Sequence, residues 1–268
     1  MKYRFSIIDF LALIILVIWI LVSLWSLVMP PMANAELSQR LLPPSQQFWF
    51  GTDSLGRQVL DLLILGAKTS FLVSFFTVFL SLCIGLPLGA FSGFYGGLVD
   101  KIISKIIDIL LSFPPLILPL TIVAFLGQDL RHIILTLSLT GWMSYARLSR
   151  GQYAFYRNHD LVLACRVIGA SDGRIMFKHL LPNIIPSLMI QATASLEGVI
   201  LAEAGLSFLG LGGGTYYVSW GSMLSDGQNY LFTHPYLVFF PAFVLFLIVF
   251  ALNTLSERIR KTLNPKES

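Results

Sequence analysis

Long apolar runs separated by shorter polar segments dominate the chain. The first run covers residues 7–29, and five more follow at 69–95, 106–127, 133–146, 184–206 and 235–255. A helix needs about 20 mostly apolar residues to cross the hydrocarbon core of a bilayer. The pattern therefore predicts an all-α, polytopic membrane protein with six transmembrane helices. The polar segment 31–67 is predicted to be a loop outside the membrane.

Composition supports this class. Of 268 residues, 56% are apolar and 12% are charged, and mean hydropathy is +0.77, whereas soluble domains are about 25% charged. The net charge of +4 does not indicate nucleic-acid binding, because most basic residues lie between apolar runs rather than in one patch. Cys83 and Cys165 lie in unlike surroundings, so neither a disulfide framework nor a metal site is predicted.

The basic residues predict the orientation, because positively charged loops are retained on the cytoplasmic side. With the N-terminus inside, 14 of the 18 Lys and Arg residues are cytoplasmic and 4 are outside. Both termini are therefore predicted to be cytoplasmic. Ala33-Asn34-Ala35 is similar to a signal-peptidase site, but the apolar run before it is longer than a signal core of roughly 7–15 residues. We expect that run to remain as a helix.

The cytoplasmic segment 147–181 shows helical periodicity of its own. Its apolar positions recur at helical spacing: Leu161, Val162, Ala164, Cys165 and Ile168. Gly169 then interrupts the pattern, Ser171 can cap a second helix with Asp172 in its first turn, and Pro182 marks the start of the next span. These signals predict two short helices on the cytoplasmic face, and an ordinary surface loop is the alternative.

Small and polar residues within the spans suggest contacts between helices. Gly85, Gly89, Gly93 and Gly97 repeat every four residues, so they are predicted to line one side of a helix as a packing seam. This seam serves either as static packing or as a surface on which helices slide during transport.

The fifth apolar run contains a similar stripe of small residues that includes Gly198, together with the polar residues Gln191, Glu197 and Glu203. Polar side chains inside a membrane are costly. We expect these residues to face a water-filled path or another subunit. Asp108, near the inner end of the third run, is expected to reach the membrane surface.

No enzymatic motif is found. The glycine-rich run 210–215 lacks the Lys and Ser/Thr of a phosphate-binding loop, and the four histidines do not form a zinc-protease motif. No serine or cysteine has the setting of a nucleophile. We therefore predict no catalytic residue, no metal ligand and no cofactor bound by this chain.

Residues 163–183 read LACRVIGASDGRIMFKHLLPN, which resembles the cytoplasmic "EAA" loop of binding-protein-dependent ABC importer permeases. Four residues match the family's spacing: Ala164, Gly169, Leu181 and Pro182. Leu163 replaces the usual glutamate, Cys165 the second alanine and His179 an aliphatic residue, so a contact made by that glutamate is not expected here.

Two further blocks resemble the dipeptide, oligopeptide and nickel group of these permeases. They are Phe50–Arg57 (FGTDSLGR) and Ala202–Gly212 (AEAGLSFLGLG). The short motifs Ser219-Trp220-Gly221, Asp226-Gly227 and Leu263-Asn264-Pro265 agree with the C-type permease of the group. The resemblance covers nearly the whole chain.

This resemblance implies a division of the chain into an N-terminal helix (1–30), an extracytoplasmic loop (31–67), a five-helix transmembrane domain (68–260) with coupling helices at 160–181, and a cytoplasmic tail (261–268). It also implies a bacterial inner-membrane location and four kinds of partner: a second permease, two ATPase subunits that hold ATP and Mg, a solute-binding protein and the lipid bilayer. The residues implied in ATPase coupling are Leu161, Ala164, Cys165, Arg166, Ile168, Gly169, Ala170, Ser171, Asp172 and Pro182.

The cargo remains open at this stage. Short peptides are the first hypothesis, nickel or a metal chelate the second, and other solutes the third. The apolar runs contain no histidine, so no track of soft metal ligands is evident.

An ion-driven secondary transporter would need an ionic site between repeated halves, and the sequence shows no clear repeat. A purely structural scaffold is the remaining alternative, and the polar fifth span argues against it.

Overall fold

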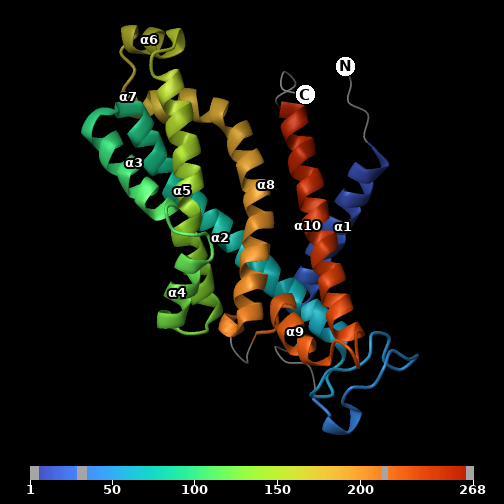
Figure 1. The fold of residues 1–268 in the computed structure, drawn as a ribbon. Helices are drawn as coiled ribbons and strands as arrows, with labels where there is room; N and C mark the ends of the chain where they lie inside the picture. Colours follow the sequence, from blue (N-terminus) through green and yellow to red (C-terminus); the bar gives the residue numbers. More distant parts are fainter. Residues whose placement is uncertain (1–5, 29–34, 213–216, 264–268) are drawn as a thin grey trace.

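The computed structural model describes residues 6–28, 35–212 and 217–263, and it is largely helical (Figure 1). Within those ranges the extended backbone forms only one isolated bridge, between Thr52 and Gln58. Parts of three sequence motifs lie outside the described residues: residues 33–34 of the signal-peptidase-like site, residues 213–215 of the glycine-rich run, and Asn264-Pro265.

The chain is built from long helices joined by shorter ones. The long helices are α1 (Ile7–Trp25), α2 (Val59–Tyr95), α5 (Leu130–Tyr156), α8 (Leu181–Leu206) and α10 (Tyr236–Leu263). The shorter ones are η1 (Leu37–Gln39), α3 (Gly97–Leu111), α4 (Ile117–Leu126), α6 (Asp160–Val167), α7 (Asp172–Arg174), η2 (Ile175–Leu180), η3 (Ser207–Leu211), α9 (Trp220–Gly227) and η5 (Gln228–Tyr230). Four helical segments of the described chain are long and apolar enough to cross a membrane: 7–25, 59–95, 172–211 and 236–262.

The long helices give the molecule two distinct ends (Figure 1). Helices α6 and α7 lie at one end, together with the start of α1 and the end of α10, and we call this the α6 end. An ion pair of 3.8 Å between Asp9 and Arg258 connects α1 to α10 there. Residues 35–58 and α9 lie at the opposite end, which we call the α9 end. The described ends of the chain are thus on the same side as α6.

The predicted third span, 106–127, is not one helix. Helix α3 ends at Leu111 and α4 begins at Ile117, and the break between them contains Pro114 and Pro115. Proline has no amide hydrogen for the helix ladder and disfavours helical backbone in the residue before it, so two in succession end α3. Helix α2 also starts earlier than predicted, at Val59 inside the segment assigned to the loop 31–67.

The prediction of two separate short helices after Asn158 is correct only for α6. Ser171 is at the N-cap position of α7, but its side chain makes no capping hydrogen bond. Helix α7 continues through the π-helical segment η2 directly into α8. Pro182 therefore lies just after the junction of η2 and α8, and the second predicted helix is the start of a long one.

Glycine brings α2 and α5 into close contact. A methyl group on Gly89 would overlap the backbone carbonyl oxygen of Ala146, and Gly85 and Gly93 meet the α5 backbone in the same way. The prediction of a glycine seam is confirmed for these three residues and wrong for Gly97. Gly97 is the first residue of α3, has a positive φ of 64°, and has no neighbouring atom within 4 Å of its Cβ position.

Helix α9 is fixed to the side of α2 by buried hydrogen bonds. The indole nitrogen of Trp220 donates to the carbonyl oxygen of Leu63 at 3.0 Å, and the hydroxyl of Thr69 donates to the carbonyl oxygen of Val218 at 2.6 Å. The Trp220 side chain is fully buried. These contacts hold α9 beside the loop that precedes α2.

Candidate functional site

Helix α6 has one face packed on its own chain and one exposed. Val162 and Cys165 are buried in a cluster that includes Tyr153, Ile175 and Met176. The exposed apolar residues of α6 and its C-terminal turn are Leu161, Leu163, Ala164, Val167 and Ile168. Cys165 was predicted to contact a partner, and this is wrong because its side chain faces the protein interior. The surface available to a partner is the opposite face.

The C-terminal turn of α6 explains why Gly169 follows it. The amide of Gly169 donates to the carbonyl of Arg166, and the amide of Ala170 donates to that of Cys165, each at 3.0 Å. This pair of bonds is the Schellman arrangement, which places its glycine in the left-handed region. Gly169 has φ of +79°. The turn leaves Val167 and Ile168 86% and 79% exposed.

Side-chain contacts tie α6 and its neighbours to the rest of the α6 end. The Arg166 guanidinium lies 5.7 Å from the centre of the Phe94 ring, and the Tyr153 hydroxyl donates to the carbonyl of Met176 at 3.1 Å. The first contact joins α6 to the end of α2, and the second joins the end of α5 to η2, on which the buried side of α6 packs. A movement of α6 would therefore act on these elements through its buried side.

Two ion pairs join α3 to α5 near the α6 end. Arg150 donates from Nη2 to Asp100 Oδ2 at 2.9 Å and also from Nε to Oδ1. The guanidinium thus contacts both oxygens of the Asp100 carboxylate. Asp108, which was expected to reach the membrane surface, is exposed and pairs with Arg147 at 3.1 Å. Helix α3 is therefore held by charge contacts on its polar side.

The polar residues of α8 lie in different surroundings. Glu203 is 1% exposed, and its Oε1 accepts a hydrogen bond of 2.7 Å from the hydroxyl of Ser207. It lies inside the chain, so the expectation that Glu203 faces a water-filled path or another subunit is wrong. Its partner Ser207 is four residues away on η3, a spacing visible in the sequence.

The other three predicted path residues are less enclosed. Glu197 is half-buried and accepts a hydrogen bond of 3.3 Å from Asn253 of α10. Gln191 is also half-buried and donates to Ser195 at 3.3 Å. Gly198 is exposed, with no atom within 4 Å of its Cβ position. Their role in a path or interface stays a prediction.

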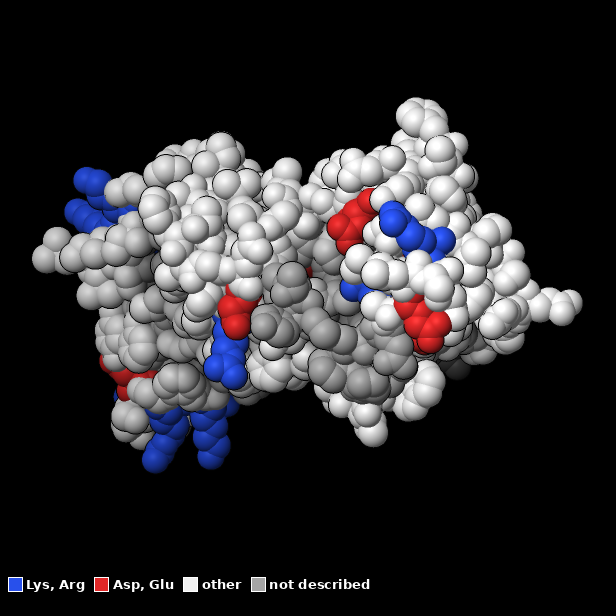
Figure 2. All heavy atoms as spheres, turned by 90° about the horizontal axis from the view of Figure 1, so that it is seen from below, with Lys and Arg blue, Asp and Glu red and all other residues white. Residues whose placement is uncertain are grey.

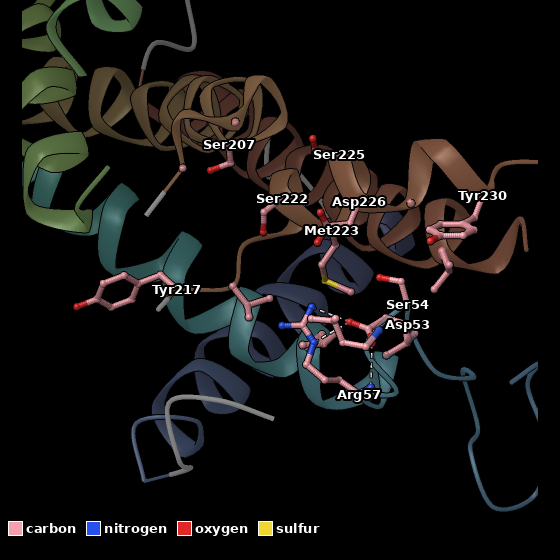
Figure 3. A pocket seen from close by; sticks show the side chains of 18 of the residues that line it. Asp53, Ser54, Arg57, Ser207, Tyr217, Ser222, Met223, Ser225, Asp226 and Tyr230 are labelled. Atoms are coloured by element: carbon pink, nitrogen blue, oxygen red, sulfur yellow. Dashed lines mark hydrogen bonds and ion pairs between the residues drawn. The ribbon is translucent and has the colours of Figure 1, made fainter. Parts of the chain in front are cut away.

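A cavity of about 510 Å³ at the α9 end was not predicted from the sequence. It lies between residues 53–59, η3 and α9, and we call it the α9 cavity (Figure 3). Asp53 and Arg57 form a 2.6 Å ion pair on one side, and Asp226 of α9 lies on the other. Charged side chains of both signs lie on the face around it (Figure 2). In the sequence, the segments Phe50–Arg57 and Asp226-Gly227 were recognised only as family motifs. Their proximity could not be predicted, because it depends on the docking of α9 on α2.

The apolar helices and the exposed helix at one end define the class: a multi-pass helical membrane protein. Residues 85–268 match the family described as "Binding-protein-dependent transport system inner membrane component", and the chain belongs to this family. The resemblance seen in the sequence is confirmed, and the chain is a transport permease subunit.

Related chains match along nearly their whole length. The dipeptide transport permease DppC of Alkalihalophilus pseudofirmus is 36% identical over 95% of this chain and 84% of its own. The oligopeptide permease OppC of Bacillus subtilis is also 36% identical, over 96% and 86%. The nickel permease NikC of Escherichia coli is 36% identical over 95% and 93%.

A solved structure shares the fold. An inward-facing conformation of the MetNI methionine ABC transporter superposes with a TM-score of 0.63, covering 76% of this chain and 96% of the other at 21% identity. The helices common to the two chains therefore share one fold.

Proposed function

We propose that this chain forms half of the translocation pathway of an ATP-driven importer for short peptides, in the bacterial cytoplasmic membrane. The observation that carries the proposal is the exposed apolar surface of α6, with Val167 and Ile168 almost fully exposed. Such a patch, away from the apolar helices, indicates a protein partner. Two cytoplasmic ATPases holding ATP and Mg, a second permease and a solute-binding protein complete the proposed complex.

In this proposal α6 receives the movement of an ATPase and transmits it to the spans. Its exposed apolar side chains fit a cleft on the ATPase, while Arg174 and Asp172 beside it offer charge contacts. Helix α7 then continues into α8 without a break, so a displacement of the α6 end reaches the spans directly. ATP shifts the equilibrium between inward-open and outward-open states through contacts that differ between the two.

We further propose six membrane spans with the α6 end in the cytoplasm. The proposed spans are α1, α2, α5, α8, α10 and the helical pair α3–α4, which replaces the single predicted third span. The concentration of Lys and Arg in the loops of the α6 end supports this orientation. Both termini are then cytoplasmic, since α1 begins and α10 ends at that side.

Cysteine labelling tests the orientation. In a Cys83→Ala, Cys165→Ala background, a cysteine replacing the exposed Asn229 at the α9 end will react with an impermeant thiol reagent added to intact cells. One replacing the exposed Asn158 beside α6 will react only after permeabilisation. The reverse labelling would show that the α6 end is outside and would rule out a contact between α6 and a cytoplasmic ATPase.

The proposed function is tested by uptake into proteoliposomes that contain the complete complex, its binding protein and ATP inside the vesicles. We expect labelled di- and tripeptides to accumulate only when the ATPases are present. Uptake by this chain alone, driven by a sodium or proton gradient, would contradict the proposal in favour of a secondary transporter.

Nickel or a nickel chelate is the second candidate cargo, favoured by the 36% identity to NikC over 95% of the chain. The same vesicles distinguish the two, because radioactive nickel would then accumulate and peptides would not. The architecture and the role of α6 are the same in both cases.

A further inference from the structure

The α9 cavity contains one carboxylate that its own chain does not neutralise. Asp53 is fully engaged: its Oδ2 accepts from Arg57 Nε at 2.7 Å, and its Oδ1 accepts from two backbone amides. Asp226 forms no hydrogen bond or ion pair within the described residues and interacts with Arg57 only at longer range. In Figure 3 its carboxyl lies across the hollow from the Asp53–Arg57 pair. The three charged groups leave the cavity with one net negative charge.

Asp226 is exposed at the rim of the cavity, and its carboxyl is still partly shielded from water. This shielding raises its pKa, while the charge of Arg57 opposes that rise. A charged group that loses water is stabilised by an opposite charge that can enter the same space. The surroundings of Asp226 therefore favour a cation.

Hydroxyl groups around Asp226 can hold a donor with several hydrogens. Ser54, Ser225 and Tyr230 line the cavity, and their hydroxyls make no hydrogen bond within the described part of the chain. An ammonium group has three donors and can use one carboxylate together with two neutral oxygens. The Tyr230 ring adds an aromatic face, which also attracts cations.

Part of the remaining lining is apolar, and the volume is that of a small-molecule pocket. Val59, Leu62, Met223 and Leu237 line the same cavity. A volume of about 510 Å³ is within the range of pockets for small molecules. The cavity thus combines one carboxylate, several hydroxyls and an apolar wall, which matches a small molecule with an ammonium group beside apolar side chains.

We propose that the α9 cavity binds the ammonium end of a small apolar solute, such as the free N-terminus of a short peptide, with Asp226 as its charge partner. One part of this inference rests on the proposed function, namely that the bound solute is cargo at the outer mouth of the pathway. Binding itself can be measured without transport.

The test uses the full-length chain, purified with the subunits that accompany it and placed in lipid nanodiscs. A Leu55→Cys substitution in the Cys83→Ala, Cys165→Ala background puts a single thiol in the cavity wall without removing any hydroxyl that would hold the ammonium group. The probes are alanyl-leucine amide, which carries an ammonium group, and its N-acetyl derivative, which does not. We expect the first to slow thiol labelling and the second to have no effect.

Asp226→Asn is the decisive variant, because it removes the charge and keeps the shape. The probe concentration for half-protection should rise about tenfold or more, since a charge-assisted hydrogen bond contributes about 1.5–3 kcal/mol. Asp129→Asn is the matched control: this half-buried residue does not line the cavity, and its asparagine can still cap α5. Protection there should be unchanged.

Three results would overturn the inference: equal protection by the acetylated probe, unchanged protection in Asp226→Asn, or protection by a divalent cation but not by the dipeptide amide. The third would instead indicate a metal site. Failure of the proposed function is separate, because absent peptide uptake by the wild-type complex leaves this binding result intact.

Discussion

Replacing Gly89 with leucine will prevent α2 and α5 from packing and will remove most of the folded protein from the membrane. Even a methyl group at this position would overlap the carbonyl oxygen of Ala146, which is backbone and cannot rotate away. Overpacking by a few carbons costs about 1–3 kcal/mol where side chains can adjust. Here two helices must separate along their closest contact, so we expect a larger loss.

The measurement is the amount of monodisperse protein after mild solubilisation and its melting temperature. Gly151→Leu is the matched control, because Gly151 is also helical, lies on α5, and has no atom within 4 Å of its Cβ position. We expect Gly151→Leu to accumulate and melt like the wild type. Equal melting temperatures for the two variants would show that the close α2–α5 approach is not required.

Changes at α6 should abolish transport while leaving the fold intact. Ala164 is exposed on the outer face of α6, so Ala164→Arg will fold normally as a free subunit. In the complex it places a charge in an apolar contact, where an unpaired buried charge costs about 3–5 kcal/mol. We expect ATP-driven uptake in proteoliposomes to fall to background and cargo to stop stimulating ATP hydrolysis. Ala164→Ser, similar in size and uncharged, should retain uptake.

Valine substitutions at two glycines test the backbone conformation of the α6 turn separately from the surface that the turn presents. Neither Gly169 nor Gly173 has an atom within 4 Å of its Cβ position, but only Gly169 has a positive φ, of 79°. Valine at Gly169 must adopt a left-handed conformation that a β-branched residue strongly disfavours, so α6 will be redirected and uptake lost. Gly173→Val keeps a helical φ and should transport. Wild-type uptake by both Gly169→Val and Ala164→Arg would show that α6 is not the coupling element.

Local patterns in the sequence predicted the features that depend on local physics. Apolar runs located the long helices, the spacing of Gly85, Gly89 and Gly93 predicted close packing, and the end of α6 was placed at Gly169. Each of these depends on residues within one or two helical turns. The break before α4 was missed because apolar length was given more weight than Pro114 and Pro115.

The features that sequence reasoning missed depend on contacts distant in the chain. Cys165 and Glu203 looked outward-facing on their own helices, but Tyr153 and Met176 cover Cys165, and the folded chain encloses Glu203. The α9 cavity forms only because residue 53 and residue 226 are brought to the same end. The periodicity of apolar residues along one helix does not show which face of that helix a neighbouring helix will cover.

The continuous helical segment from Asp172 to Leu211 has a consequence for coupling. Its 40 residues bend near the start of α8 (Figure 1) and include the non-helical residue Gly210, so the segment is not a straight rod. It nevertheless joins α7, beside α6, to η3, beside the α9 cavity, so a shift at one end can be passed to the other. Thermodynamic linkage then requires reciprocity: a solute that prefers one position of η3 biases the position of α7 by the same free energy, so occupancy at the α9 end affects the α6 end without a separate signalling element.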